Sequence, residues 1–170
     1  MSTNEIRIDR EALTAIVAHA RRDAPNECCG LLVGHPAALP EHGTAGPAPD
    51  SALGASSGKE AGPHVLEAIP CSNGSSEPAK RYEISPVDYF AQIKRCRRIN
   101  EAQSENFAVV GAYHSHPRGG PEASETDTAQ AFRDFVFVIV GVGGEARGMK
   151  IRAYTFDDER LTPGALTVVD

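Results

Sequence analysis

Two histidines at the end of an apolar run constrain this chain more than any other feature. The run Phe107–Tyr113 is typical of a buried strand, and His114 and His116 follow it directly. Because alternate residues of a strand point to the same face, the two imidazoles lie on one side, about 6–7 Å apart along the strand. Pro117 then stops the strand. The pattern predicts a strand that ends in two side chains placed to share one metal ion.

The residues after this strand offer a third ligand. Asp127 lies at the start of a helix that we expect near Glu125–Arg133. Two histidines and one carboxylate leave a position for water, which is the arrangement of a catalytic rather than a structural zinc site. Glu122 and Glu125 are rival ligands by spacing alone. Spacing alone therefore decides neither which residues bind the metal nor whether the two histidines bind a metal at all.

Ser124 has two interpretations that overlap. Ser124 and Asp127 form a Ser-x-x-Asp pattern, which is a capping box that starts a helix. In the second interpretation, the Ser124 hydroxyl donates a hydrogen bond during catalysis. A capped helix start is rigid, and rigidity is what a metal ligand and a catalytic donor require. The pattern alone favours the cap.

Glu27 stands at the opening of another apolar run, for which we expect the short buried strand Cys28–Gly34. It is either a solvated strand end or a general base beside a metal-bound water, and spacing does not select it among the acidic residues. Cys28 and Cys29 come next, and we expect both to pack as small hydrophobic residues rather than to act as nucleophiles. The chain has no C-x-x-C pair, which argues against a cysteine-rich zinc site or a redox dithiol.

Length and charge restrict the classes of function. The chain has 170 residues, enough for a single domain (1–170) with a hydrophobic core. Its net charge of −6 argues against a nucleic-acid backbone as partner. No apolar run approaches the length of a membrane span, and the start MSTNEIRIDRE lacks the features of a secretory signal. We therefore expect a cytoplasmic protein that binds neither membrane nor nucleic acid.

Helix and strand patterns follow one another without regular alternation. Helices are expected over Arg10–Arg22 with Asp9 as cap, from Pro86 with Ser85 as cap, and near Glu125–Arg133. The helix from Pro86 is expected to carry an apolar stripe of Val87, Phe90, Ile93 and Cys96. Strands are expected over Cys28–Gly34, His64–Pro70, Arg81–Ile84, Phe107–His114, Phe135–Gly141, Met149–Phe156 and, weakly, Ala165–Val169. The segment 36–63, rich in Ala, Gly, Pro and Ser, predicts a flexible insertion. The mixture predicts an α/β fold of α+β-like kind, with a central mixed sheet flanked by helices.

The candidate residues together resemble the signature of the JAMM/MPN+ zinc metalloproteases. That signature is a distant Glu, then His-x-His-Pro, six residues, Ser, two residues and Asp. Glu27, the run His114-Ser115-His116-Pro117, Ser124 and Asp127 match it in order and spacing. The surrounding stretches ECCGLLVG, YEISPVDYF, VVGAYHSHP and IRAYTF also resemble short bacterial members. One departure is Ala123, which stands where the family often has proline.

The resemblance assigns a role to each matched residue. It implies a JAMM/MPN (cytidine-deaminase-like) architecture with one zinc ion (Zn²⁺), held by His114, His116 and Asp127 with water as fourth ligand. Glu27 would take a proton from that water and pass it to the leaving amine. The Ser124 hydroxyl would donate a hydrogen bond to the oxyanion that develops on the scissile carbonyl.

The resemblance also implies a substrate class. Similar bacterial proteins are peptidases or isopeptidases that act next to the C-terminal Gly-Gly of ubiquitin-like sulfur-carrier proteins, in sulfur transfer or cysteine biosynthesis. The alternative is a non-catalytic MPN-type scaffold that binds proteins, although scaffold members lack parts of the motif. A RadC-like protein shares a related His-x-His-Pro…Ser-x-x-Asp pattern, but nothing here resembles that family's other features, and the acidic charge argues against DNA. A zinc deaminase would require H-x-E and P-C-x-x-C, and neither is present.

Overall fold

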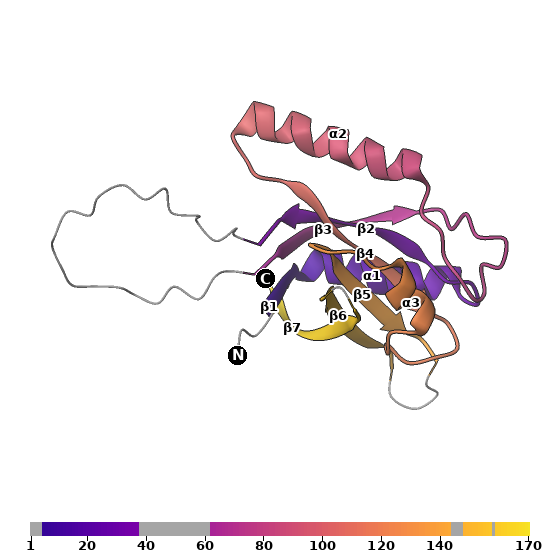
Figure 1. Cartoon of the computed structure of the whole chain (residues 1–170). Helices are drawn as coiled ribbons and strands as arrows, with labels where there is room; N and C mark the ends of the chain where they lie inside the picture. Colours follow the sequence, from indigo (N-terminus) through magenta and orange to yellow (C-terminus); the bar gives the residue numbers. More distant parts are fainter. Residues whose placement is uncertain (1–4, 38–61, 144–147, 158) are drawn as a thin grey trace, which may run out of the picture.

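A computed structural model describes residues 5–37, 62–143, 148–157 and 159–170 of the chain. Figure 1 shows the order of its helices and strands. In chain order these are β1 (Glu5–Asp9), α1 (Arg10–Asp23), β2 (Cys29–His35), β3 (His64–Cys71), α2 (Pro86–Gln103), β4 (Ala108–His116), α3 (Glu125–Gln130), β5 (Val136–Gly141), β6 (Lys150–Phe156) and β7 (Leu161–Val169).

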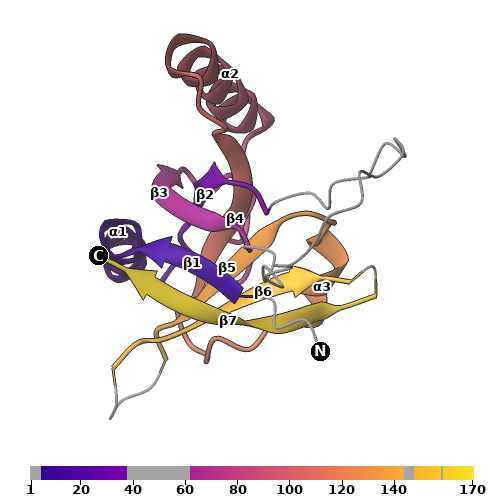
Figure 2. The same cartoon turned by 90° about the vertical axis from the view of Figure 1, so that its left-hand side faces the viewer.

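The strands form one mixed sheet that closes on itself. Their order is β1-β3-β2-β4-β5-β6-β7, and β1 also pairs with β7. Strand β1 runs parallel to both of its neighbours and β4 runs parallel to β5, while the other pairs are antiparallel. Figure 2 shows β1 lying between β3 and β7, where it completes the ring. The mixed α/β class predicted from the sequence is confirmed.

The strand that closes the sheet is one that the sequence pattern did not predict. Strand β1 has only five residues, too few for a clear alternation, yet Ile6 and Ile8 are fully buried in the core. Burial of each such side chain stabilises the fold by about 1.5–3 kcal/mol. They belong to the same core cluster as Ile16 of α1, so the strand and the helix contribute to one hydrophobic core.

Strand β5 is the most buried element, with all six of its residues inside the protein. An uninterrupted apolar strand is what a sheet covered on both faces requires. One face of β5 joins the main core around Val138, and the other joins a second cluster that contains Ile139 and Tyr154. The strand beside it, β4, therefore has a rigid neighbour along its whole parallel pairing.

Helix α2 differs from the apolar stripe predicted for it. Ser85 caps it as predicted, because its hydroxyl accepts a hydrogen bond from the Val87 amide. Of the predicted stripe, Cys96 is buried, but the side chains of Val87 and Phe90 are 75% and 58% exposed. Figure 1 shows why: α2 lies along the outside of the sheet and only part of it reaches β4. None of the helices in the described ranges is long and apolar enough to cross a membrane.

Three local predictions need correction. Residues 81–84 are not a strand; they run as an extended loop whose backbone is bound by the side chain of Asn73. Asp9 does not cap α1 with its side chain, because its carboxylate instead bonds His64 Nε2 at 2.7 Å. Helix α3 ends at Gln130, since Ala131 is already extended. Most of the predicted insertion, residues 38–61, lies outside the described residues.

Candidate metal centre and active site

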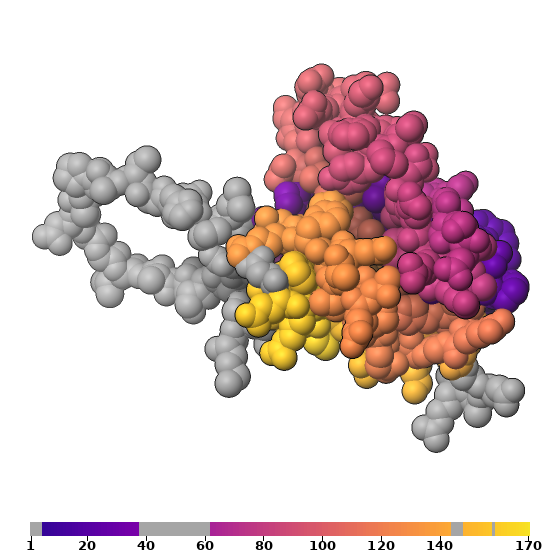
Figure 3. All heavy atoms as spheres, turned by 45° about the vertical axis from the view of Figure 1, so that its right-hand side comes forward, coloured from indigo at the N-terminus to yellow at the C-terminus, as the bar shows by residue number. Residues whose placement is uncertain are grey.

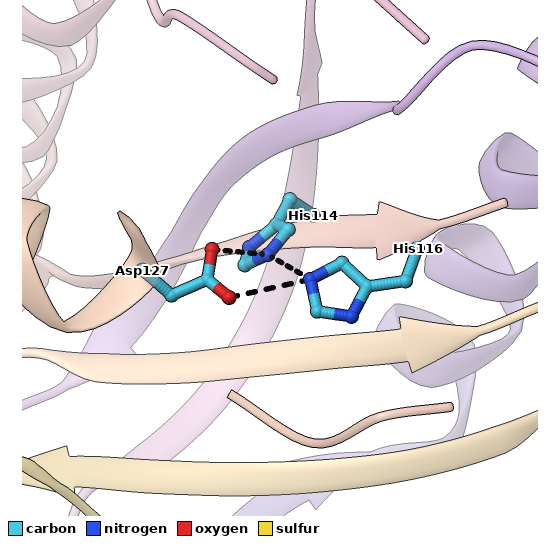
Figure 4. A group of neighbouring side chains, drawn as sticks. All are labelled: His114, His116 and Asp127. Atoms are coloured by element: carbon cyan, nitrogen blue, oxygen red, sulfur yellow. Dashed lines mark hydrogen bonds and ion pairs between the residues drawn. The ribbon is translucent and has the colours of Figure 1, made fainter. Parts of the chain in front are cut away.

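Three donor atoms converge at the end of β4. Asp127 Oδ1 lies 3.0 Å from His114 Nε2, and Asp127 Oδ2 lies 3.3 Å from His116 Nε2. The two histidine Nε2 atoms are 3.1 Å apart. Ligands placed tetrahedrally 2.0–2.1 Å from zinc would be separated by about 3.3 Å. Figure 4 shows both rings turned toward the carboxylate, so this set fits one zinc ion with a fourth position left for water.

The sheet holds the backbone of His114 on both edges and that of His116 on the β5 edge. Strand β4 pairs with β2 and with β5, which places His114 between Cys29 and Ile139. His114 is only 2% exposed. His116 is the last residue of the strand, and its carbonyl still accepts a hydrogen bond from the Val142 amide at 3.0 Å. The backbone that carries the predicted ligands is therefore fixed by regular sheet pairing.

The turn after β4 sets the orientation of the His116 ring. His116 Nδ1 lies 2.9 Å from the carbonyl oxygen of Gly120, so the Nδ1 proton is donated there and the Nε2 lone pair is free for a cation. This turn rests on the end of β5. A Cβ atom at Gly141 would lie 2.5 Å from the carbonyl carbon of Gly120, a distance that no side chain tolerates. Glycine at position 141 thus lets the turn approach the sheet closely.

The capping-box interpretation of Ser124 is confirmed. The Asp127 amide donates to Ser124 Oγ at 3.1 Å, and the Ser124 amide donates to Asp127 Oδ2 at 2.7 Å. The Ser124 hydroxyl also donates to Asp127 Oδ2 at 2.6 Å. Ser124 itself is exposed at the surface while Asp127 is buried. The helix start therefore fixes the carboxylate and leaves a hydroxyl beside it at the rim.

The charges of the three ligands suit a cation. Burial lowers the pKa of His114, which favours its neutral, metal-binding form. Burial would raise the pKa of Asp127, but hydrogen bonds with His114, His116 and Ser124 hold it well below its usual range. The hydrogen bond with Asp127 raises the pKa of His116. An ionised carboxylate and two rings with inward-facing nitrogens form an electron-rich pocket.

Glu27, which lies just before β2, lines the same cavity as two of the convergent donors. A cavity of about 440 Å³ is lined by Glu27 together with His116, Ser124 and Asp127. Figure 3 looks at the face where the orange residues around α3 meet the magenta residues that follow β3. Glu27 is 8% exposed, and burial, with Asp127 adding to it and His116 opposing it, raises its pKa to about 7. A carboxylate with that pKa takes up and releases protons near neutral pH.

The structure separates the ligand set from its rivals. Glu122 is exposed at the rim, and its carboxylate lies 3.5 Å from Arg152 Nη1. Neither Glu122 nor Glu125 belongs to the group of convergent donors found among the described residues. The cysteines next to Glu27 behave as expected for packing residues, because burial raises the pKa of Cys28 to about 11 and that of Cys29 to about 12.

Sequence reasoning missed two aromatic residues of this site. The ring of Tyr82 stacks on the His114 imidazole, with centroids 4.4 Å apart and an interplanar angle of 20°. The Tyr154 hydroxyl donates to the Pro121 carbonyl at 2.7 Å and accepts from the Ala123 amide at 3.2 Å, which supports the approach to Ser124. Neither residue has a spacing signal, because both contacts join segments far apart in the sequence.

Comparison with known proteins agrees with this geometry. Residues 9–157 match the family model described as prokaryotic homologs of the JAB domain. The chain is 27% identical over 165 residues to the desampylase of Haloferax volcanii, covering 94% of this chain and 95% of that protein. It is 28% identical over 164 residues to the CysO-cysteine peptidase of Mycobacterium tuberculosis, covering 96% and 90% respectively.

Solved structures show the same fold. A protein of Desulfitobacterium hafniense, solved in solution, superposes with a TM-score of 0.71 at 19% identity and covers 97% of this chain and 93% of its own. A JAB1/MPN domain protein from Archaeoglobus fulgidus gives a TM-score of 0.51 at 17% identity and covers 97% of both chains. The family match spans most of the sequence and includes every residue of the site. The chain therefore belongs to the prokaryotic JAB domain family, as the resemblance of its motif to the JAMM/MPN+ signature predicted.

Proposed function

We propose that this protein is a zinc-dependent peptidase or isopeptidase. It hydrolyses an amide bond next to the C-terminal Gly-Gly of a ubiquitin-like sulfur-carrier protein or a similar conjugate. One observation carries the proposal: the convergent donors come from β4 and the start of α3, and two of them, His116 and Asp127, line one cavity together with Glu27. Convergence of a ligand set with a carboxylate of raised pKa is typical of a hydrolytic metal site.

Each residue has a task in this reaction. His114, His116 and Asp127 hold the zinc ion, which when bound lowers the pKa of a water molecule and polarises the scissile carbonyl. Glu27, with a pKa of about 7, accepts a proton from the attacking water and donates it to the departing amine.

Ser124 assists at the developing oxyanion. Its hydroxyl, now directed to Asp127 Oδ2, turns to the carbonyl oxygen of the substrate as negative charge develops there. The Ser124 amide keeps its own hydrogen bond to Asp127 throughout, so the carboxylate stays fixed while the hydroxyl moves.

The substrate class rests on the relatives. One is named for removing a conjugated modifier and the other for releasing cysteine from CysO. The cavity lining includes Ala79, Gly119 and Gly120, which place little side-chain bulk beside the site, in keeping with a substrate tail that lacks side chains. Free, buried thiols at all four cysteines favour a reducing compartment, and we place the reaction in the cytoplasm. We also propose that residues 1–170 act as one domain.

A non-catalytic scaffold is the competing function. A scaffold needs no general base, so burial of Glu27 beside a metal ligand set would have no use there. Burying a carboxylate costs free energy unless it is compensated, and the raised pKa of Glu27 records that cost. Burial of the Glu27 carboxylate despite this cost supports the catalytic function.

A cleavage experiment tests the proposal. Sulfur-carrier protein extended by one cysteine after Gly-Gly is incubated with zinc-loaded enzyme, and the intact mass is measured with and without chelator. We expect loss of one residue that chelator abolishes and added zinc restores. If zinc-loaded enzyme leaves this substrate intact, the sulfur-carrier protein is not the substrate. A parallel incubation with an isopeptide-linked conjugate tests the other proposed substrate class.

A further inference from the structure

The side chain of Asn73 lies just behind the wall of the site and uses its full hydrogen-bonding capacity on backbone groups. Its Nδ2 donates to the carbonyl of Glu27 at 3.0 Å and to that of Arg81 at 2.8 Å. Its Oδ1 accepts from the amides of Ser75 at 2.9 Å and Glu83 at 3.1 Å. Two carbonyl partners on nitrogen and two amide partners on oxygen fix which way the amide is turned.

The sheet explains why Asn73 meets Glu27. Strands β2 and β3 are antiparallel, and Cys29 pairs with Cys71 at their last common register position. Two residues beyond that pair in each direction stand Glu27 and Asn73. The backbone ladder has ended there, so the Asn73 side chain takes the place of the next ladder hydrogen bond to the Glu27 carbonyl. The Glu27 amide is bound by the same loop, because it donates to the Pro78 carbonyl at 2.7 Å.

The same side chain also fixes Tyr82. Its bonds to Arg81 and Glu83 bracket Tyr82 on both sides, and residues 81–84 have no sheet pairing of their own. The Tyr82 ring is the one that stacks on His114. One amide thus joins the backbone of Glu27 to the backbone that carries the ring against a metal ligand.

We propose that Asn73 is a positioning residue for the hydrolytic reaction, which holds Glu27 and the Tyr82 wall in register with the metal ligands. This inference rests on the proposed function. Asn73 lies outside the signature residues and outside the group of convergent donors. Its effect is expected on the rate of the chemical step, because misplacement of a catalytic group by about 1 Å costs up to about 10²-fold in rate.

Two substitutions separate the functions of the amide. Asn73→Asp keeps the oxygen that accepts from Ser75 and Glu83, but it replaces the donor to the Glu27 carbonyl by a second oxygen. The two hydrogen bonds from the Ser75 and Glu83 amides remain, while those to the Glu27 and Arg81 carbonyls are lost. Asn73→Ala removes all four hydrogen bonds. Both variants leave every metal ligand in place, so zinc content is expected to match that of the wild type.

Asn100 offers a matched control. Its amide also binds backbone on both sides, donating to the Phe107 carbonyl at 2.9 Å and accepting from the Phe107 amide at 2.7 Å. Phe107 directly precedes β4, at the end opposite His116 and roughly 30 Å away at strand rise. Asn100→Asp and Asn100→Ala therefore remove the same kind of bond without touching the site.

The experiment measures kcat, KM, zinc content and amide hydrogen exchange for all four variants. For Asn73→Asp and Asn73→Ala we expect kcat to fall about 10–10²-fold with KM and zinc unchanged, and exchange of the Glu27 amide to become at least about tenfold faster. The Asn100 variants are expected to leave kcat and Glu27 exchange unchanged.

Two results would overturn the inference: wild-type kcat and Glu27 exchange in both Asn73 variants, or equal losses in the Asn100 variants at matched thermal stability. Absence of cleavage by zinc-loaded wild type would instead contradict the proposed function, and Glu27 exchange would then decide the inference by itself. If Asn73→Ala does not fold, Asn73→Asp gives the same comparison.

Discussion

The two sides of the active site are built by different means. His114 and His116 sit on a strand that is paired on both edges, and one neighbour, β5, is buried along its whole length. Glu27 sits in a loop just before β2, where the sheet ladder has ended. Its carbonyl accepts a hydrogen bond from the Asn73 side chain, and its amide donates one to the Pro78 carbonyl. The side that carries the proposed metal ligands is therefore fixed by the fold, while the side that carries the proposed base is fixed by local contacts.

This difference has a consequence for how the site tolerates change. A ligand on a paired strand can be removed with little movement of its neighbours, so its loss affects metal binding alone. A base held by a few loop bonds can be displaced without being removed. Substitution of a metal ligand, of the base or of Ser124 therefore changes a different property of the site in each case.

Loss of a metal ligand is expected to have the largest effect. His116→Ala removes one of three donors but leaves β4 paired, so the protein is expected to fold without zinc and to retain less than about a thousandth of wild-type activity. Zinc content and cleavage rate measure this. His64→Ala is the control, since His64 also pairs with a carboxylate, Asp9 at 2.7 Å, away from the ligand group. Full zinc in His116→Ala would contradict the assigned ligand set.

Loss of the base is expected to come next and to spare the metal. Glu27→Gln keeps the size of the side chain and removes its proton-accepting charge, so kcat is expected to fall about 10²–10⁴-fold with zinc retained. Glu122→Gln, a change of another carboxylate that lines the same cavity, is expected to have wild-type kcat. Equal kcat in Glu27→Gln and wild type would sink the assigned base.

Ser124 is proposed to have both a catalytic and a structural role, so its loss is expected to lower both kcat and the stability of the fold. Ser124→Ala removes the oxyanion donor, worth about 10²-fold in kcat, and a helix cap worth about 1 kcal/mol. Ser85→Ala removes the matching cap of α2, where the Ser85 hydroxyl accepts from the Val87 amide. It is expected to lower stability without lowering kcat. A Ser124 variant with wild-type kcat would restrict that hydroxyl to capping.

The smallest effect is a pH dependence of stability in the zinc-free protein. Burial raises the pKa of Glu27 from its ordinary 4.5 to about 7 in the folded state. The folded state therefore binds more protons between these values, and this contribution to stability is present below pH 4.5 and lost as the pH rises through about 7. Denaturant unfolding between pH 4 and 8 is expected to show a steeper decline for wild type than for Glu27→Gln. Parallel curves would mean that Glu27 is solvated.

The sequence was most informative where a single element or a fixed spacing decides the structure. The apolar run before His114 predicted β4, and the signature picked out the three donors that converge at its end, because those residues lie within one strand and one capped helix start. The sequence did not reveal β1, which is too short to show a period and is a strand only because β3 and β7 pair with it.

The errors share a physical cause, which is contact between distant segments. Residues 81–84 alternate like a strand, but no neighbouring strand is available and the Asn73 side chain binds their backbone instead. Phe90 belongs to the apolar stripe predicted for α2, yet the helix lies outside the closed sheet and leaves the Phe90 side chain 58% exposed. Tyr82 meets His114 only through the fold, so no spacing along the chain could reveal the stack.

The central claim is that one zinc ion sits between β4 and α3, next to Glu27. Anomalous X-ray scattering at the zinc edge, from crystals of protein purified without chelator, tests it most directly. We predict a single zinc peak about 2.0–2.2 Å from His114 Nε2, His116 Nε2 and a carboxylate oxygen of Asp127, with a water as fourth ligand. A zinc-supplemented crystal with no peak at these three residues, or with its zinc bound elsewhere, would contradict the account.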